Sequence, residues 1–204
     1  MAYRIFLVDD DPAVSRALEA VGQLMNLPVR AFSSAEQFLE KRPTDTHGCL
    51  ILDIRLPGLS GLELLDKLRD SEGELPVIVI SGHADVPQAV LAMRRGALTV
   101  LEKPFSLQTL IAHIREALDR DERLREQRRQ RYEARRRLAT LTDREREVLA
   151  LITRGLSNKQ IAAELNLTLR AIEDRRARLM RRLSIRSVAE LLALVQQADS
   201  PTTP

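Results

Sequence analysis

The stretch CLILD, residues 49–53, decides the fold of the N-terminal part, because four apolar residues lead directly into an aspartate. Apolar runs of this length and composition are typical of buried parallel strands. Three other runs have the same form: residues 4–8 before Asp9 and Asp10, residues 77–80 before Ser81, and residues 98–102 before Lys103. Together with Asp53, five polar side chains therefore follow four predicted strands.

Amphipathic segments separate these runs. Residues 14–25 and 62–69 carry apolar side chains at helical spacing. Alternating strands and helices predict an α/β fold with a doubly wound parallel sheet. In such sheets, sites form at the carboxyl ends of the strands, beside a topological switch point. We therefore expect the five polar side chains to meet at one end of the sheet.

The five residue types suit phosphoryl transfer to an aspartate. Asp9, Asp10 and Asp53 repel one another unless a cation joins them, and a hard divalent ion such as Mg²⁺ prefers oxygen ligands. The ion would neutralise charge on a phosphoryl group while Asp53 attacks phosphorus. Lys103 would supply positive charge and Ser81 a hydrogen bond to the phosphoryl oxygens. Ordinary loop acids and a surface lysine are the alternative, which five matched residues at strand ends disfavour.

Four motifs lie within residues 1–120: FLVDDDPAV, LILDIRLPGLSGLELL, PVIVISGHADVPQAV and LEKPF. They resemble response-regulator receiver domains of the FixJ-like class, and this resemblance implies a flavodoxin-like fold with a five-stranded parallel sheet. The resemblance implies that Asp53 is the phosphoacceptor and Asp10 a direct Mg²⁺ ligand. It also implies that Asp9 acts through a metal-bound water and that the carbonyl of Arg55 completes the protein ligands. No organic cofactor is implied.

Two residues depart from the receiver pattern. Val100 stands where receivers usually have Phe or Tyr, and Thr99 stands where Asp is common. In receivers that ring changes rotamer as the Ser or Thr moves toward phosphate. The resemblance thus implies an intact phosphorylation site, including a cis peptide between Lys103 and Pro104, without the aromatic part of the readout. Alternatively, Val100 is simply a smaller side chain in the same pocket.

Charge divides the chain into an acidic and a basic part. Residues 1–120 contain 13 Lys and Arg against 17 Asp and Glu, a net charge of −4. Residues 121–204 contain 19 against 12, a net of +7, and the two parts sum to +3. The basic part predicts a polyanionic partner. No apolar run approaches a membrane span and no signal peptide opens the chain, so we expect a cytoplasmic protein with no membrane partner.

Residues 121–139 form a predicted helical linker. This segment is rich in arginine and contains neither proline nor glycine. Behind it, three capping-box patterns predict helix starts at Thr142, Ser157 and Ser187. A fourth helix should begin after residues 166–168 and end near Leu183. Four short helices with a tight turn between the second and third predict a small all-α helix-turn-helix domain.

Residues 141–195 carry the motifs REREVL, GLSNKQIA and RARLMRRL. Together they resemble a LuxR-type DNA-binding domain, for which we expect residues 140–198, followed by a disordered tail at 199–204. By motif position, Glu173, Asp174 and Ala177 would read bases. The predicted DNA-facing side also includes basic residues, most of them suited to phosphate contacts: Lys159, Arg170, Arg175, Arg178, Arg181 and Arg182.

Asp174 is an unusual residue for this position, where an apolar or amide side chain is commoner. One explanation is intrahelical pairing with Arg170 and Arg178, four residues to either side. The other is direct acceptance of a hydrogen bond from a cytosine amino group in the major groove.

The sequence thus predicts a phosphorylation-controlled transcriptional regulator. A histidine kinase would phosphorylate Asp53, and the C-terminal domain would bind double-stranded promoter DNA. The resemblance to receivers also implies that a homodimer forms on activation through the fourth helix and fifth strand, from Val86 to Leu101. The chain would be no enzyme beyond promoting its own phosphorylation and slow dephosphorylation.

Two alternatives remain open at this point. In the first, DNA binding is independent of phosphorylation and the receiver is only an interaction module, as Val100 and Thr99 favour. The second, a phosphoaspartate hydrolase, fits poorly because Arg55 stands where such enzymes need a second Asp.

Overall fold

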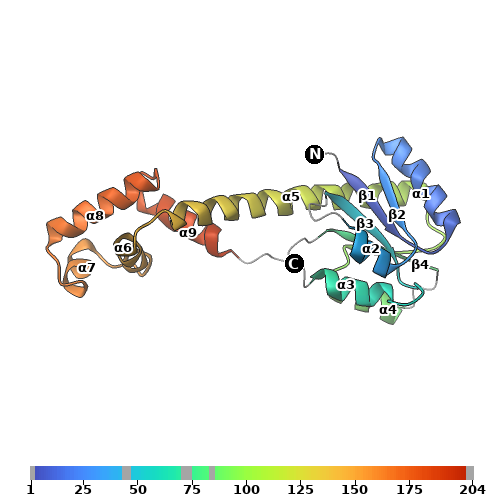
Figure 1. The fold of residues 1–204 in the computed structure, drawn as a ribbon, viewed down its shortest axis with the longest axis horizontal. Helices are drawn as coiled ribbons and strands as arrows, with labels where there is room; N and C mark the ends of the chain where they lie inside the picture. Colours follow the sequence, from blue (N-terminus) through green and yellow to red (C-terminus); the bar gives the residue numbers. More distant parts are fainter. Residues whose placement is uncertain (1–2, 43–46, 70–74, 83–85, 201–204) are drawn as a thin grey trace. The chain divides into compact units, whose positions relative to one another are not determined.

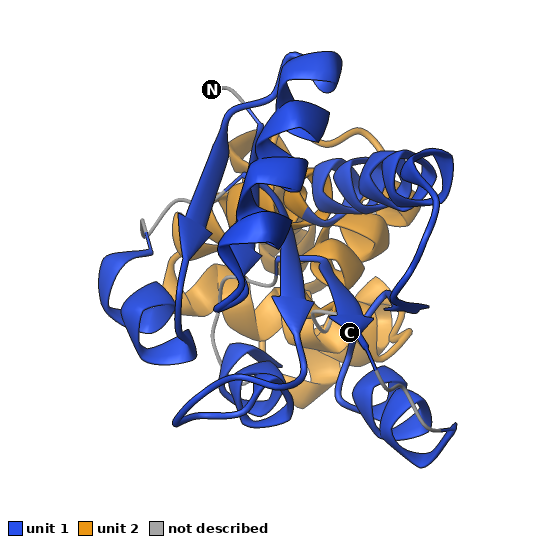
Figure 2. Ribbon diagram, turned by 90° about the vertical axis from the view of Figure 1, so that its right-hand side faces the viewer, with its two compact units in different colours: residues 1–124, 204 blue, residues 125–203 orange. Residues whose placement is uncertain are grey.

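The computed structural model describes residues 3–42, 47–69, 75–82 and 86–200. The chain divides into two compact units, the first ending at Leu124 and the second beginning at Arg125 (Figure 2). Residues 201–204 of the predicted tail lie outside the described ranges, whereas Asp199 is the last residue of a helix.

The first unit contains the predicted five-stranded parallel sheet, with strand order β2-β1-β3-β4-β5. The strands are β1 (Arg4–Val8), β2 (Val29–Phe32), β3 (Gly48–Asp53), β4 (Val77–Ser81) and β5 (Thr99–Glu102). β1 pairs with both β2 and β3. The chain therefore runs from the middle of the sheet to one edge and returns to β3, which makes the β1–β3 junction the switch point where sites form.

Helices cover both faces of this sheet (Figure 1). On one face α1 (Pro12–Met25) and the first part of α5 (Leu107–Ala139) pack on alternate strand residues such as Ile5 and Leu7. On the other face α2 (Ala35–Lys41), α3 (Gly61–Arg69) and α4 (Val86–Arg94) pack on the intervening residues, such as Phe6 and Val8. Strands buried on both faces explain the continuous apolar runs in the sequence.

Helix α5 is tied to the beginning of β3 by a buried aspartate. Asp121 is 1% exposed, and its Oδ2 accepts a hydrogen bond of 3.0 Å from the backbone N–H of Gly48. Gly48 has φ of +132°, and a Cβ there would lie 1.7 Å from the carbonyl oxygen of Arg4. The glycine therefore permits the close approach of β1. The first unit also includes Asp121, which lies beyond the domain boundary expected at residue 120.

The second unit holds α6 (Asp143–Thr153), α7 (Asn158–Glu164), α8 (Leu169–Arg182) and α9 (Val188–Asp199). The capping boxes predicted at Thr142 and Ser157 are both present. At α9 the box is incomplete, because the carboxylate of Glu190 accepts from the N–H of Arg186 instead of that of the cap residue Ser187. Each helix nevertheless begins where the sequence predicts.

One apolar core joins these four helices and includes Ala134, near the end of α5. Between α7 and α8, Asn166 adopts a left-handed conformation with φ of 51°. The guanidinium of Arg176 donates to Asn158 Oδ1 at 2.6 Å and links α8 to the start of α7. This geometry is that of a helix-turn-helix.

Throughout the described ranges, no helix combines the length and the apolar composition that crossing a membrane requires.

Candidate functional site

Two aspartates and a lysine meet at the switch point of the sheet. Asp53 ends β3 and Asp9 directly follows β1, whose last residue Val8 lies opposite Leu52. Lys103 follows β5, and its Nζ donates to Asp9 Oδ2 at 2.9 Å and to Asp53 Oδ2 at 2.7 Å. Three residues far apart in the sequence thus form one ion-paired group, because parallel strands end at the same edge.

Backbone amides hold the other oxygen of each carboxylate. The N–H of Asp11 donates to Asp9 Oδ1, and the N–H of Arg55 donates to Asp53 Oδ1, both at 2.9 Å. In each case the donor lies two residues past the aspartate, in the loop that leaves the strand. Asp11 has a further role as N-cap of α1, where its carboxylate accepts from the N–H of Ala13 at 2.7 Å. The two carboxylates are therefore fixed in orientation.

Burial shifts the pKa values of the charged groups at this site. The Asp9 side chain is 1% exposed, and this burial raises its pKa, an effect that hydrogen bonds from Asp11 and Lys103 offset only in part. For Lys103, burial lowers the pKa, but hydrogen bonds to Asp53 and Asp9 outweigh it and hold the pKa above its usual value. The ammonium stays charged, and two carboxylates share it.

The other predicted residues take different positions. Ser81 ends β4 and is fully buried, and its carbonyl accepts from the N–H of Lys103 at 2.8 Å. Asp10 is exposed beside the group, and Arg55 is exposed while its N–H contacts Asp53. The Lys103–Pro104 peptide is cis, as the resemblance implied.

The residues present suit a hard divalent cation. Nowhere in the described ranges do three His, Cys, Asp or Glu side chains form a complete metal-binding group. The predicted direct ligands, however, are only two carboxylates and one carbonyl, with water supplying the remainder. The buried pair Asp9 and Asp53 also carries one negative charge more than Lys103 neutralises. An oxygen-only donor set with excess negative charge fits Mg²⁺.

Val100 replaces the expected aromatic residue with a small side chain inside the sheet. It lies opposite Val79 in β4 and packs, partly buried, against the core beneath α2, α3 and α4. Its surroundings are those of an ordinary strand residue.

A second candidate site lies on α8 of the C-terminal unit. Ile172 and Leu179 are fully buried, as is nearly all of Leu183 at the end of the helix. The predicted DNA-facing residues lie mostly on the exposed side of the helix-turn-helix. Arg175 is half-buried, and the other predicted residues are exposed: Lys159, Arg170, Glu173, Asp174, Ala177, Arg178, Arg181 and Arg182.

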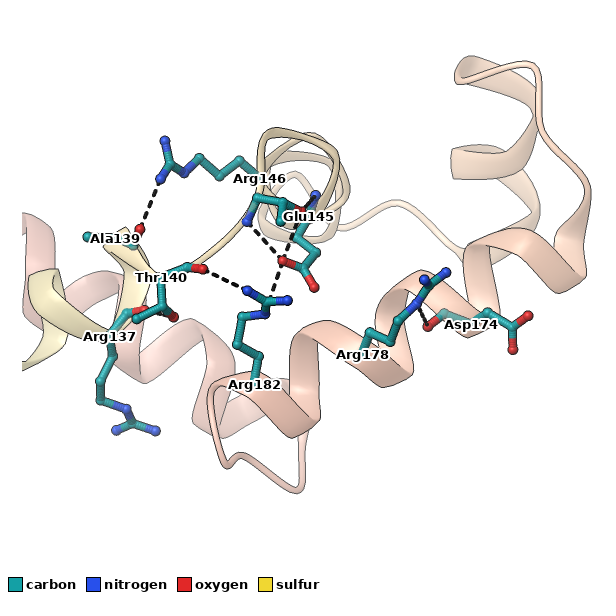
Figure 3. Close-up of polar contacts among 9 residues, drawn as sticks. Arg137, Ala139, Thr140, Glu145, Arg146, Asp174, Arg178 and Arg182 are labelled. Carbon is teal, nitrogen blue, oxygen red and sulfur yellow. Dashed lines mark hydrogen bonds and ion pairs between the residues drawn. The ribbon is translucent and has the colours of Figure 1, made fainter.

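Arg182 differs from the expected phosphate contact, because its guanidinium is engaged within the protein (Figure 3). It donates to the carbonyl of Thr140 at 3.1 Å and pairs with the carboxylate of Glu145 at 3.3 Å. Glu145 is 6% exposed, and its hydrogen bond from the backbone of Thr142 is the main cause that lowers its pKa. Arg182 therefore holds the end of α5 and the start of α6 to α8.

Arginines cap several helix C-termini in this unit. The Arg137 guanidinium donates to the carbonyl of Leu183, and Arg146 donates to that of Ala139 at 3.1 Å. Arg135 donates to the carbonyl of Ala198 at 3.0 Å. These carbonyls lack partners within their own helices, so the guanidinium groups satisfy them. The sequence shows only a run of arginines here, and no local signal identifies their acceptors.

Asp174 does not make the intrahelical ion pairs expected with Arg170 and Arg178. Arg178 Nε instead donates to the backbone carbonyl of Asp174 at 3.3 Å (Figure 3). Across the described part of the chain, the carboxylate of Asp174 has no hydrogen bond or ion pair. The pairing explanation for this residue is therefore wrong in the structure.

Comparisons with known proteins identify a family for each of the two parts of the chain. Residues 5–115 match the family described as response regulator receiver domain, and residues 139–195 match the bacterial regulatory proteins of the luxR family. The chain is 40% identical over 203 residues to the transcriptional regulatory protein FixJ of Azorhizobium caulinodans, covering 97% of this chain and 96% of FixJ. It is 38% identical over 190 residues to nodulation protein W of Bradyrhizobium diazoefficiens, covering 93% and 84% of the two chains.

Among solved structures, that of response regulator StyR aligns with a TM-score of 0.81 at 38% identity, covering 97% of this chain and 100% of StyR. The paired acidic and lysine residues at the switch point and the helix-turn-helix lie within the two matched regions. The chain therefore belongs to the FixJ-like response regulators, transcriptional regulators that join a receiver domain to a LuxR-type DNA-binding domain.

Proposed function

We propose that a histidine kinase phosphorylates this regulator on Asp53 and that phosphorylation controls its dimerisation and promoter binding. Phosphorylation control is typical of the family, and a receiver domain implies a kinase partner. The observation that carries the proposal for this chain is the ammonium of Lys103 shared between Asp53 and Asp9. That arrangement pairs a fixed nucleophilic carboxylate with a cation that can accompany an incoming phosphoryl group.

In the proposed transfer, a carboxylate oxygen of Asp53 attacks phosphorus while the bond to the kinase histidine nitrogen breaks. The N–H of Arg55 holds Oδ1 of Asp53, so the carboxylate keeps one orientation as it reacts. Lys103 remains protonated and contacts the transferred phosphoryl oxygens, and the hydroxyl of Ser81 donates to another. The chain promotes its own phosphorylation and slow dephosphorylation, and it has no other enzymatic activity.

Asp10, Asp53 and the carbonyl of Arg55 would hold Mg²⁺ directly, and Asp9 would act through a bound water. When bound, the ion supplies charge neutralisation for the phosphoryl group. The excess negative charge of the buried Asp9–Asp53 pair supports this assignment.

Apolar side chains on α4 support a dimer face between Val86 and Leu101. Val86 is 76% exposed, Val90 46% and Met93 49%. Exposed apolar side chains grouped on one short helix are typical of protein–protein contact surfaces. A second receiver that covers them on activation would place two DNA-binding domains on neighbouring half-sites.

Acetyl phosphate tests the phosphoacceptor. With Mg²⁺, we expect one acid-labile phosphoryl group on the full chain by intact mass, and none on Asp53→Asn. Glu102→Gln is the matched control, because it removes an exposed carboxylate at the same end of the sheet. Undiminished labelling of Asp53→Asn would refute the assignment.

A second candidate function is promoter binding that does not depend on phosphorylation. Val100 favours it, because the side chain at that position is packed as an ordinary strand residue and offers no aromatic switch. Sedimentation and DNA titration, each with and without beryllofluoride, separate the two functions. Tighter dimers and tighter DNA binding with beryllofluoride support phosphorylation control, whereas two unchanged values support the second candidate.

A further inference from the structure

Asp174 lies in the middle of the outward row of α8. At about 100° of rotation per residue, Asp174, Arg170, Ala177 and Arg181 all lie within about 40° of the direction opposite to Ile172. Ile172 is fully buried, and these four residues are exposed. Glu173, at about 100° from Ile172, lies on the flank of the helix. Asp174 is therefore the acidic residue that this row presents most directly.

The carboxylate of Asp174 is available to a ligand although arginines surround it in the sequence. Arg178 donates to the backbone carbonyl of Asp174, and Arg182 is held by Thr140 and Glu145 (Figure 3). Both carboxylate oxygens of Asp174 thus keep their full accepting capacity. An exposed carboxylate on a helix that binds DNA is repelled by phosphates, so it weakens binding unless it meets a donor on the bases.

We propose that Asp174 accepts a hydrogen bond from the N4 amino group of a cytosine in the major groove. This inference rests on the proposed promoter binding through α8. In the major groove only cytosine N4 and adenine N6 offer donors, whereas guanine and thymine present acceptors that repel a carboxylate. Adenine places its N7 acceptor beside the amino group, and cytosine has no such acceptor, so cytosine is the better partner.

Asp174 therefore determines specificity at one base pair of each half-site. Arg170 and Arg181 lie on either side of it in the same row and carry the charge that contacts phosphates. The methyl group of Ala177, one turn further along, leaves room for a close approach of the helix to the base edges.

The test begins with selection of duplex DNA from a random pool by the full-length protein. At each selected position we then measure binding of the four base pairs, at fixed salt, for the wild type, Asp174→Ala and Glu147→Ala. Glu147→Ala is the matched control, because it removes one exposed carboxylate from α6 in the same unit. At one position we expect the wild type to prefer cytosine by roughly 5- to 150-fold. Asp174→Ala should lose this preference and bind random duplex more tightly, while Glu147→Ala keeps it.

Substitution of that cytosine by N4-methylcytosine identifies the atom involved. The methyl group replaces the hydrogen that faces the major groove while Watson–Crick pairing is retained. The methyl group should weaken DNA binding by the wild type and leave DNA binding by Asp174→Ala unchanged. If wild type selects no consensus, the proposed promoter recognition fails. If a consensus is selected but Asp174→Ala keeps every base preference, or N4-methylcytosine has no effect on wild type, only the role of Asp174 is overturned.

Discussion

Asp9 should destabilise the metal-free receiver, and Asp9→Asn should relieve this effect. The Asp9 and Asp53 oxygens lie 2.9 and 2.7 Å from the same lysine nitrogen, so they are at most about 6 Å apart. At an effective dielectric constant of ~20, two unit charges at that distance repel by about 3 kcal/mol. Burying a carboxylate costs several kcal/mol more, and attraction to Lys103 offsets only part of the sum. We expect Asp9→Asn to stabilise the first unit by about 1–2 kcal/mol at pH 7.

The pH dependence follows from the raised pKa of Asp9. Burial raises this pKa above the ordinary value of 3.8, so the folded state takes up a proton more readily than the unfolded state does. The destabilisation is therefore complete above the raised pKa and disappears below pH 3.8. The stability difference between Asp9→Asn and wild type should shrink as the pH falls toward that value.

Hydrogen exchange of the β1 and β3 amides, followed by mass spectrometry in EDTA, measures the effect in the full-length protein. We expect exchange about 5- to 30-fold slower in Asp9→Asn than in wild type at pH 7. Asp10→Asn is the control, because Asp10 is exposed and carries no burial penalty. Faster exchange in Asp9→Asn, or an equal gain in Asp10→Asn, would refute the electrostatic reasoning.

Two further predictions concern other parts of the chain. Arg182→Ala should lower the stability of the C-terminal unit by about 1–3 kcal/mol, because it leaves buried Glu145 without its cation and the Thr140 carbonyl without its donor. Chemical denaturation measures the free energy of unfolding of both this variant and Arg181→Ala, which removes an exposed arginine and should change stability little. Equal losses of stability in the two variants would contradict the role of Arg182. Cys49 is fully buried, which raises the pKa of its thiol to about 12. Iodoacetamide at pH 8 should therefore label it only after urea unfolds the chain, and rapid labelling of native protein would show otherwise.

Four strands of the sheet, and the meeting of Asp9, Asp53 and Lys103 at its edge, were predictable because they follow from local patterns. The ion pairs that Lys103 makes with the two aspartates were not predicted. Apolar runs that end in Asp9, Asp53 and Lys103 indicate parallel strands, and parallel strands bring their carboxyl ends together. Strand β2 has no such signal. It lies at an edge of the sheet, only Phe32 of its four residues is fully buried, and Arg30 lies over the Phe32 ring at 5.1 Å from the centroid. Edge strands keep a solvent-facing side, so hydrophobicity alone does not identify this one.

The role of Arg182 could not be predicted, because its partners come from other elements. Helical periodicity places it on the exposed side of α8, where a phosphate contact is the natural expectation. Its acceptor on Thr140 lies 42 residues earlier in the chain. The error on Asp174 has a related cause: spacing of four residues permits an ion pair with Arg178, but a guanidinium also has backbone carbonyls within reach. Side-chain spacing shows which contacts are possible, but the tertiary structure determines which of them form.

The hydrogen bond between Asp121 and Gly48 has a consequence for anyone who exchanges output domains between regulators. A fusion joined at residue 120 would discard the acceptor and leave the Gly48 N–H without it at a buried position, which costs about 1–3 kcal/mol. A fusion joined after Leu124 keeps the aspartate and the whole first unit. The segment that can be transferred as a folded unit therefore extends beyond the sheet and its surrounding loops. Part of its stability comes from Asp121, which lies in the segment predicted to be a linker.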